Sequence, residues 1–157
     1  MRVVEKCLTS ADPKIVWRVL ADVEHWRDWT PTIIEIKPVN DKTLTAGARY
    51  RVVQPKLRPA IYEVTECVPN QRFMWAQNIL GGNMVADHRL RPYKGGTEIE
   101  LSFSTDGLFA NLVGRIFSKL IAQYVATEAR SLKIKCDYLA AEAAEVRSVP
   151  NSPVKHR

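Results

Sequence analysis

The chain has 157 residues, of which 46% are hydrophobic and 25% are charged, and its formal net charge is +6. This length fits one ordinary domain, which can bury a core without help from metals or disulfides. No apolar run approaches the roughly 18 residues that cross a bilayer, so no transmembrane segment is expected, and 7 Gly with 3 Cys exclude the collagen-like and disulfide-rich classes.

The positive charge is concentrated in two segments. Half of it lies in residues 147–157, where Arg147, Lys155 and Arg157 have no acidic neighbour. We predict that this basic tail is disordered and that residues 1–146 form a single domain. The second segment runs from residue 42 to residue 62 without an acid, and its main cations are Arg49, Arg51, Lys56 and Arg58.

We expect these four cations to lie on the solvated face of an ordinary strand and loop. The alternative is that they meet an anionic partner or a ligand carboxylate near the strand ends. The segment has neither an aromatic-plus-basic repeat nor a glycine-rich RNA-binding signature, so no nucleic-acid partner is expected.

The cysteines indicate the compartment rather than a chemistry. Cys7, Cys67 and Cys136 are far apart, with no CxxC pair and no histidine at metal-binding spacing. Such thiols are usually small buried hydrophobes, so no metal site is expected. Charged residues at the start of the chain also leave no apolar stretch for a secretion signal. We therefore predict a cytoplasmic protein.

A strand and two short helices are predicted first. Residues 2–9 form the strand, and Asp12 followed by Pro13 is typical of an N-cap and the first position of a helix. Apolar residues at helical spacing continue this helix to Asp22. A shorter helical segment follows over residues 23–28, before the sequence Trp29-Thr30-Pro31.

The apolar period then changes to two, which indicates strands joined by short turns. With the first strand this gives about six or seven strands, and an antiparallel meander with one apolar face is expected. The alternating segments lie near residues 34–37, 49–52, 62–65, 73–77, 84–91 and 98–104.

From Gly107 onward the pattern is helical again. Apolar residues recur every three or four positions, and residues 108–146 are predicted to form one long amphipathic helix. Such a helix must bury its apolar stripe against the sheet. A curved sheet wrapped around a long helix leaves space between the two layers, and we expect any ligand to bind there.

Several local sequences support a family resemblance. They are Ala11-Asp12-Pro13 with Val16-Trp17, Trp26, Trp29-Thr30-Pro31, Val64-Thr65-Glu66-Cys67-Val68-Pro69, His88-Arg89-Leu90-Arg91-Pro92 and Gly95-Gly96-Thr97. In this order the chain resembles the START / Bet v 1-like (SRPBCC) superfamily, most closely its polyketide cyclase/dehydrase and lipid transport group. The resemblance implies an α+β helix-grip fold. It also implies a small hydrophobic ligand held between sheet and helix.

His88 is the candidate catalytic residue. By alternation it shares the apolar face of its strand with Met84, Ala86 and Leu90, so it should face the long helix. It is then either a core histidine with one hydrogen bond or a cavity histidine that orients a ligand oxygen or transfers a proton. The sequence places no second titratable group clearly on this face.

The other candidate ligand-binding residues are mostly aromatic or apolar. Trp26 and Trp29 would pack in the core or form an aromatic rim at one end of the fold. Gln77 and the tyrosine hydroxyls would supply polar contacts in an apolar pocket. The remaining candidates are Tyr50, Tyr62, Trp75, Met84, Leu101, Phe103, Val113, Phe117 and Tyr124.

Three functions stay open at this point. The first is binding or transport of a small hydrophobic molecule such as a lipid, a quinone or a polyketide-like compound. The second is a cyclase, dehydrase or isomerase that uses His88 for proton transfer, and the third is a protein or RNA interaction module. No GxSxG, HExxH, phosphate-binding loop or dinucleotide fingerprint is present, so no cofactor is expected. Homodimerisation through exposed strand edges is not decided by the sequence.

Overall fold

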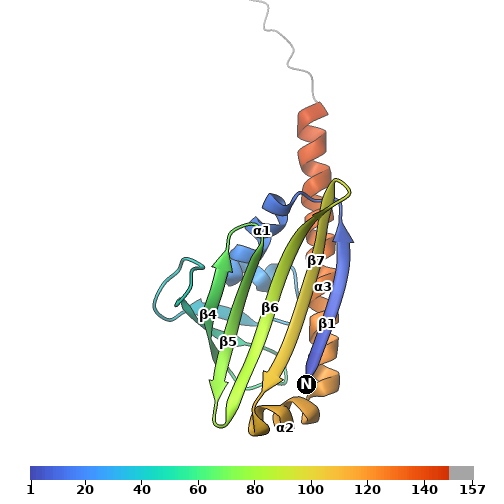
Figure 1. The fold of residues 1–157 in the computed structure, drawn as a ribbon. Coiled ribbons are helices and arrows are strands. Elements are labelled where there is room, and N and C mark those ends of the chain that lie inside the picture. The colour runs from blue at the N-terminus through green and yellow to red at the C-terminus, as the bar shows by residue number, and fades with distance from the viewer. Residues whose placement is uncertain (149–157) are drawn as a thin grey trace, which may run out of the picture.

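The computed structural model describes residues 1–148, and it shows one curved antiparallel sheet with helices on its concave side (Figure 1). The seven strands follow the order β1-β7-β6-β5-β4-β3-β2, so each is hydrogen-bonded to an antiparallel neighbour. Every connection from β2 to β7 joins adjacent strands, as the predicted meander requires. The strands are β1 (Arg2–Thr9), β2 (Glu35–Pro38), β3 (Arg49–Val53), β4 (Ala60–Val68), β5 (Arg72–Ile79), β6 (Gly82–Tyr93) and β7 (Gly96–Asp106).

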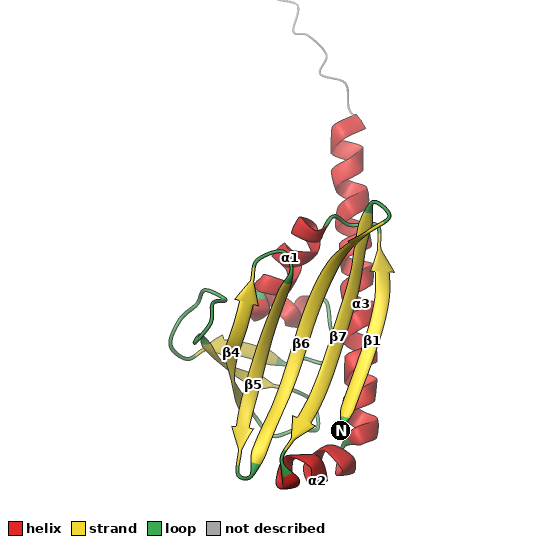
Figure 2. Cartoon of the chain, in the orientation of Figure 1, coloured by secondary structure: helices red, strands yellow, loops and turns green. Residues whose placement is uncertain are grey.

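Two short helices connect β1 to β2. Helix α1 (Pro13–Ala21) begins as predicted, with the Asp12 carboxylate accepting a 2.8 Å hydrogen bond from the Lys14 amide. The segment η1 (Val23–Asp28) is a tighter 3₁₀ helix. Both lie behind the sheet, toward the end opposite the β5–β6 turn (Figure 2).

The prediction of one helix over residues 108–146 was wrong in one respect, because the chain turns at Phe117. Helix α2 (Leu108–Ile116) crosses the end of the sheet, and α3 (Ser118–Ser148) then runs along its concave face (Figure 1). Apolar residues recur at helical spacing in both helices, so the apolar period continues through the turn and cannot reveal it. The expected burial of the whole stripe also fails in α2, where Leu108, Leu112 and Ile116 are exposed. Gly114 allows α2 to pack closely against β7, since a Cβ at this position would lie only 2.9 Å from Cγ2 of Thr105.

Gly107 permits the sharp entry into α2. Its φ is +94°, in the left-handed region, and a Cβ there would lie 2.2 Å from the Gly81 carbonyl oxygen. Only glycine satisfies both conditions without strain. The β5–β6 turn and the start of α2 are therefore held side by side at one end of the molecule.

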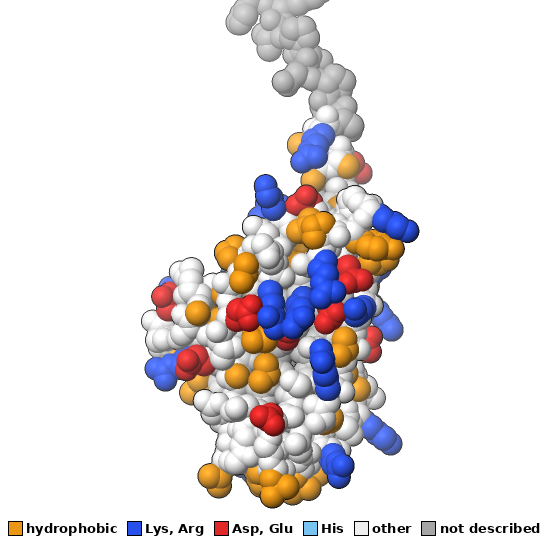
Figure 3. Space-filling model, viewed as in Figure 1, with side chains coloured by type: hydrophobic (Ala, Val, Ile, Leu, Met, Phe, Trp, Pro, Cys, Tyr) orange, Lys and Arg blue, Asp and Glu red, His pale blue; other side chains and the backbone are white. Residues whose placement is uncertain are grey.

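The outer face of the sheet carries a network of ion pairs. The Arg72 guanidinium binds the Asp87 carboxylate at 2.8 Å and Glu66 at 2.9 Å, while Arg89 also binds Asp87. These residues belong to β4, β5 and β6, and Figure 3 shows Lys, Arg, Asp and Glu gathered across the middle strands of this face. Arg51 is likewise paired, with Glu35 at 3.3 Å. The strand residues that face the opposite way are mostly apolar and buried, among them Phe73, Trp75, Ile99 and Leu101.

Helix α3 is two residues longer than predicted, since Arg147 and Ser148 belong to it. The rest of the predicted tail, residues 149–157, lies outside the described residues. None of the helices in residues 1–148 combines the length and apolar composition needed to span a membrane.

Asp137 attaches the outer half of α3 to the end of β1. Its carboxylate accepts hydrogen bonds from Thr9 Oγ1 at 2.6 Å and from the Ser10 amide at 2.9 Å, and it pairs with Lys133. Burial raises the pKa of Asp137, but the hydrogen bonds from Lys133, Thr9 and Ser10 outweigh that effect and lower it to about 2.

We predict that Asp137→Asn lowers the free energy of unfolding at neutral pH by about 1–2 kcal/mol, because it removes charge-assisted hydrogen bonds. The folded-state pKa lies below the ordinary 3.8, so the carboxylate stabilises the fold above about pH 4 and this contribution is lost as the pH falls toward 2. Urea unfolding at several pH values checks this. The difference from wild type should shrink below about pH 4, and Glu142→Gln should show no such pattern.

Candidate ligand cavity

A cavity of about 520 Å³ lies between the concave face of the sheet and helices α2 and α3. This volume is in the range of ordinary small-molecule sites. Strands β3 to β7 form one wall and the two helices form the other. The apolar side chains in the lining include Trp26, Ile33, Val52, Trp75, Ile79, Met84, Leu101, Phe103, Phe109, Val113, Phe117, Ile121 and Val125.

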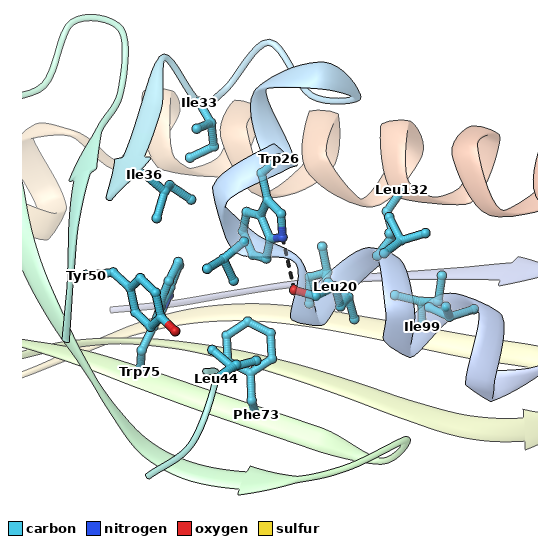
Figure 4. Close-up of a cluster of buried hydrophobic side chains, with 14 of the residues drawn as sticks. Leu20, Trp26, Ile33, Ile36, Leu44, Tyr50, Phe73, Trp75, Ile99 and Leu132 are labelled. Atoms are coloured by element: carbon cyan, nitrogen blue, oxygen red, sulfur yellow. Dashed lines mark hydrogen bonds between the residues drawn. The ribbon is translucent and has the colours of Figure 1, made fainter. Parts of the chain in front are cut away.

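The inner end of the cavity is closed by an aromatic cluster. Trp26 projects from η1 into the space between α3 and the strands, and its indole N–H donates a 3.0 Å hydrogen bond to the Leu20 carbonyl (Figure 4). The Trp26 ring lies 5.5 Å from that of Trp75 and 6.1 Å from that of Phe73, measured between ring centroids. Because Trp26 is 1% exposed, this end is closed to solvent.

His88 faces this closed end, on the side of β6 that alternation predicts. It lies directly across from Phe73 on β5, and the two rings are stacked with centroids 4.1 Å apart. The side chain is buried, and Nδ1 lies 3.4 Å from the Phe73 carbonyl oxygen. Its other ring nitrogen, Nε2, lies 3.5 Å from Oε1 of Glu128.

Glu128 is the residue that sequence reasoning missed. It reaches the cavity from α3, with 13% of its side chain exposed, and its other oxygen lies 3.4 Å from Thr32 Oγ1. A signal was present in the sequence, because residue 128 falls four positions after Tyr124 and four before Leu132 on the apolar stripe of the helix. A carboxylate at such a position either has a buried partner or faces a cavity.

Tyr62 completes the polar group at this end. It lines the cavity from β4, and its ring is 5.4 Å from that of Trp75. Burial, and secondarily the negative charge of Glu128, raise the pKa of the Tyr62 phenol to about 12. The hydroxyl therefore stays protonated at neutral pH and can donate a hydrogen bond to a ligand.

The opposite end of the cavity is open to solvent. The lining residues Lys56, Arg58, Phe109 and Phe117 are exposed there, and we call this group the mouth. Lys56 and Arg58 belong to the loop between β3 and β4, whereas Phe109 lies on α2. The Tyr124 hydroxyl on α3 donates a hydrogen bond to the Pro55 carbonyl, which ties the loop to the helix.

All but two of the residues predicted from the sequence to bind ligand line the cavity. Trp29 lies behind Trp26, with ring centroids 5.4 Å apart, and Tyr50 is fully buried with its hydroxyl donating to the Lys42 carbonyl. Two cations of the 42–62 segment, Lys56 and Arg58, line the mouth of the cavity. Arg49 and Arg51 do not line it. Besides Glu128, the lining includes Gln54 and Leu57, which the sequence did not single out.

No group of three or more His, Cys, Asp or Glu side chains that could hold a metal ion occurs in residues 1–148. The polar side chains that line the cavity are His88, Glu128, Tyr62, Tyr124, Ser102, Gln54 and Gln77, with Lys56 and Arg58 at the mouth. Such a set can hydrogen-bond a ligand and exchange protons with it.

The model of the polyketide cyclase/dehydrase and lipid transport family matches residues 2–136. The chain belongs to this family, as the local sequences had indicated. No curated protein matches the chain significantly.

Solved structures confirm the fold. A hypothetical protein, jhp0584, from Helicobacter pylori is 14% identical, with a TM-score of 0.74 over 87% of this chain and 88% of that one. The protein TTHA0849 from Thermus thermophilus is 18% identical, with a TM-score of 0.69 over 90% and 99% of the two chains. The di-domain ARO/CYC StfQ of the steffimycin biosynthetic pathway is 9% identical, with a TM-score of 0.69 over 89% of this chain and 51% of StfQ. At these identities the likeness shows a shared fold only.

We predict that Tyr124→Phe loosens the loop at the mouth. The variant loses the bond to the Pro55 carbonyl, so amide hydrogen exchange in residues 55–60 should accelerate several-fold, while global stability falls by only about 1 kcal/mol. Mass-spectrometric hydrogen exchange measures both effects. Tyr138→Phe, which removes an exposed hydroxyl bonded to Glu142, should leave the loop unchanged. Equal exchange rates in the wild type and both variants would contradict the role of Tyr124 in holding this loop.

Proposed function

We propose that this member of the family binds a small hydrophobic molecule in the cavity between the sheet and α3. The observation that carries the proposal is a cavity of about 520 Å³ with a mainly apolar and aromatic lining. Apolar surface gains about 25 cal/mol for each Å² removed from water, so such a lining favours a hydrocarbon or aromatic ligand. A lipid, a quinone or a polyketide-like compound has this character.

The polar groups at the closed end support binding of a molecule with one polar terminus. His88, Glu128 and Tyr62 lie close together at this end, whereas the rest of the lining is mainly apolar. Its other polar side chains are Gln54, Gln77, Ser102 and Tyr124, with Lys56 and Arg58 at the mouth. A ligand oxygen buried at the closed end without a partner would cost about 1–3 kcal/mol. The three side chains at that end can provide the partner and thereby fix which end of the ligand enters first.

The family description and the ARO/CYC neighbour agree with this role without naming a ligand for this chain. The Arg49–Arg58 segment offers no separate observation in favour of an interaction module, since Arg51 is paired with Glu35 and two of its cations line the mouth.

We predict that filling the cavity abolishes binding. Nile red, a neutral hydrophobic dye, should bind the wild-type protein stoichiometrically, and Ala86→Trp should weaken binding at least about tenfold because the indole occupies the ligand's space. Fluorescence titration and native mass spectrometry measure the affinity and the stoichiometry.

Val85→Trp is the matched control, because residue 85 is the strand neighbour of Ala86 and points to the outer face. Circular dichroism verifies that both variants fold. Equal affinity of Ala86→Trp and wild type would place the dye elsewhere and refute the proposal.

A second function is favoured by one observation, the 3.5 Å approach of Glu128 Oε1 to His88 Nε2. A carboxylate next to a histidine stabilises the imidazolium that forms when the ring accepts a proton. With a carbonyl ligand in the cavity, His88 would take a proton from the carbon beside the carbonyl, and the enolate would then recover a proton from His88. This is proton transfer of the kind that a cyclase, dehydrase or isomerase requires.

This second function predicts hydrogen exchange at a bound ketone. In heavy water, methyl nonyl ketone should incorporate deuterium beside its carbonyl faster with the protein than without it, as followed by NMR. His88→Ala should lose about a hundredfold of that acceleration, the size of a lost general base. His25→Ala, a change at an exposed histidine bonded to Asp22, should retain full activity. If His88→Ala changes only stability, catalysis through this residue is excluded.

A further inference from the structure

We propose that the ligand is an elongated apolar carboxylic acid that carries a hydroxyl group at its far end. Its carboxylate lies at the mouth beside Lys56 and Arg58, and its hydroxyl donates a hydrogen bond to Glu128 at the closed end. The inference rests on the proposed binding function and adds the chemical class and orientation of the ligand.

The mouth is positive. Lys56 and Arg58 line it from a segment without acids over residues 42–62, and the helical wall is acid-free over residues 107–127. Within residues 1–148, neither cation has a carboxylate within 4.0 Å. A single exposed ion pair contributes about 0.2–1 kcal/mol, and two cations next to an apolar cavity reinforce each other. An anionic group fits here.

The closed end selects against a second anion. The side chain of Glu128 is 13% exposed and lies among Trp26, Tyr62 and His88. Two unit charges 4 Å apart repel by about 4 kcal/mol at an effective dielectric constant of 20. A ligand carboxylate next to Glu128 would meet repulsion of this order, so an acid must enter with its carboxylate toward the solvent.

The same end has spare capacity to accept a hydrogen bond. The contacts of Glu128 are 3.5 Å to His88 Nε2 and 3.4 Å to Thr32 Oγ1, both longer than the usual 2.7–3.2 Å. A carboxylate has about four acceptor positions, and these two long contacts leave it poorly satisfied. A ligand hydroxyl can approach more closely and donate to it. The segment between the two ends is mainly apolar, with Met84, Phe103 and Val113 among its lining residues.

The inference is tested with ligands that differ only at their ends. The probes are ω-hydroxydodecanoic acid, its methyl ester, dodecanoic acid and dodecanedioic acid, each titrated against bound Nile red. On the wild-type protein, the ω-hydroxy acid should bind tightest and the diacid at least about tenfold more weakly, which is the effect of about 1.4 kcal/mol of repulsion or lost hydrogen bonding.

Two sets of variants separate the two ends. The double variant Lys56→Gln/Arg58→Gln should weaken the ω-hydroxy acid about tenfold and leave its methyl ester unchanged. Lys42→Gln/Arg49→Gln removes two cations of the same segment that do not line the cavity, and it should change neither affinity. Glu128→Gln should reduce the discrimination against the diacid to about twofold, because a neutral amide no longer repels the second carboxylate.

The outcomes distinguish the two proposals. If Nile red does not bind, the binding function itself fails. If Nile red binds but acid and ester compete equally, and the mouth variant changes neither, the carboxylate is not held at the mouth and the inference is overturned. If the diacid binds the wild-type protein as tightly as the ω-hydroxy acid does, the proposed hydrogen bond to Glu128 is overturned, and no variant is needed to show it.

Discussion

The position of Trp26 determines where the core of this protein ends and its cavity begins. Its indole is held by a hydrogen bond to the Leu20 carbonyl and packs against Phe73, Trp75 and His88. Beyond this ring, toward α2, the concave face of the sheet is covered by the helices. A curved sheet cannot follow a straight helix closely over its whole length, so the side chains on the two walls do not meet there. The cavity is what remains.

Charged side chains lie on both faces of the sheet, in different surroundings. On the outer face, Arg72 and Arg89 both bind the buried carboxylate of Asp87, in a network that also includes Glu66. On the inner face, Glu128 and His88 lie among aromatic rings, in surroundings where each interaction has a larger effect. The paired charges of the outer face nearly cancel, so they add little to the net charge of the chain. The properties of the cavity depend on the charges of the inner face.

Most of the fold could be predicted from the sequence, because alternation and helical spacing directly report which face of each element is buried. His88 was placed correctly on the inner face for this reason. Glu128 was not, because its contact with His88 links α3 to β6 and the two residues are 40 positions apart in the chain. No local pattern encodes such a contact. The turn at Phe117 escaped detection because α2 and α3 both have apolar faces. Tyr50 alternates with the inward residues but ends in solid core, since alternation cannot distinguish a packed face from a cavity wall.

The two proposed functions, binding and proton transfer, would use the same two side chains in this cavity, and the ligand would decide between them. The 3.5 Å between Glu128 Oε1 and His88 Nε2 is long for a hydrogen bond, so either residue can bond a ligand atom that lies beside both of them. A hydroxyl there donates to the carboxylate and the complex is stable, which suits a carrier. A carbon acid there can lose its proton to the imidazole, and the adjacent carboxylate stabilises the charge that results. The same site is thus compatible with both proposed functions, and the bond that a ligand presents at the closed end would determine which one occurs.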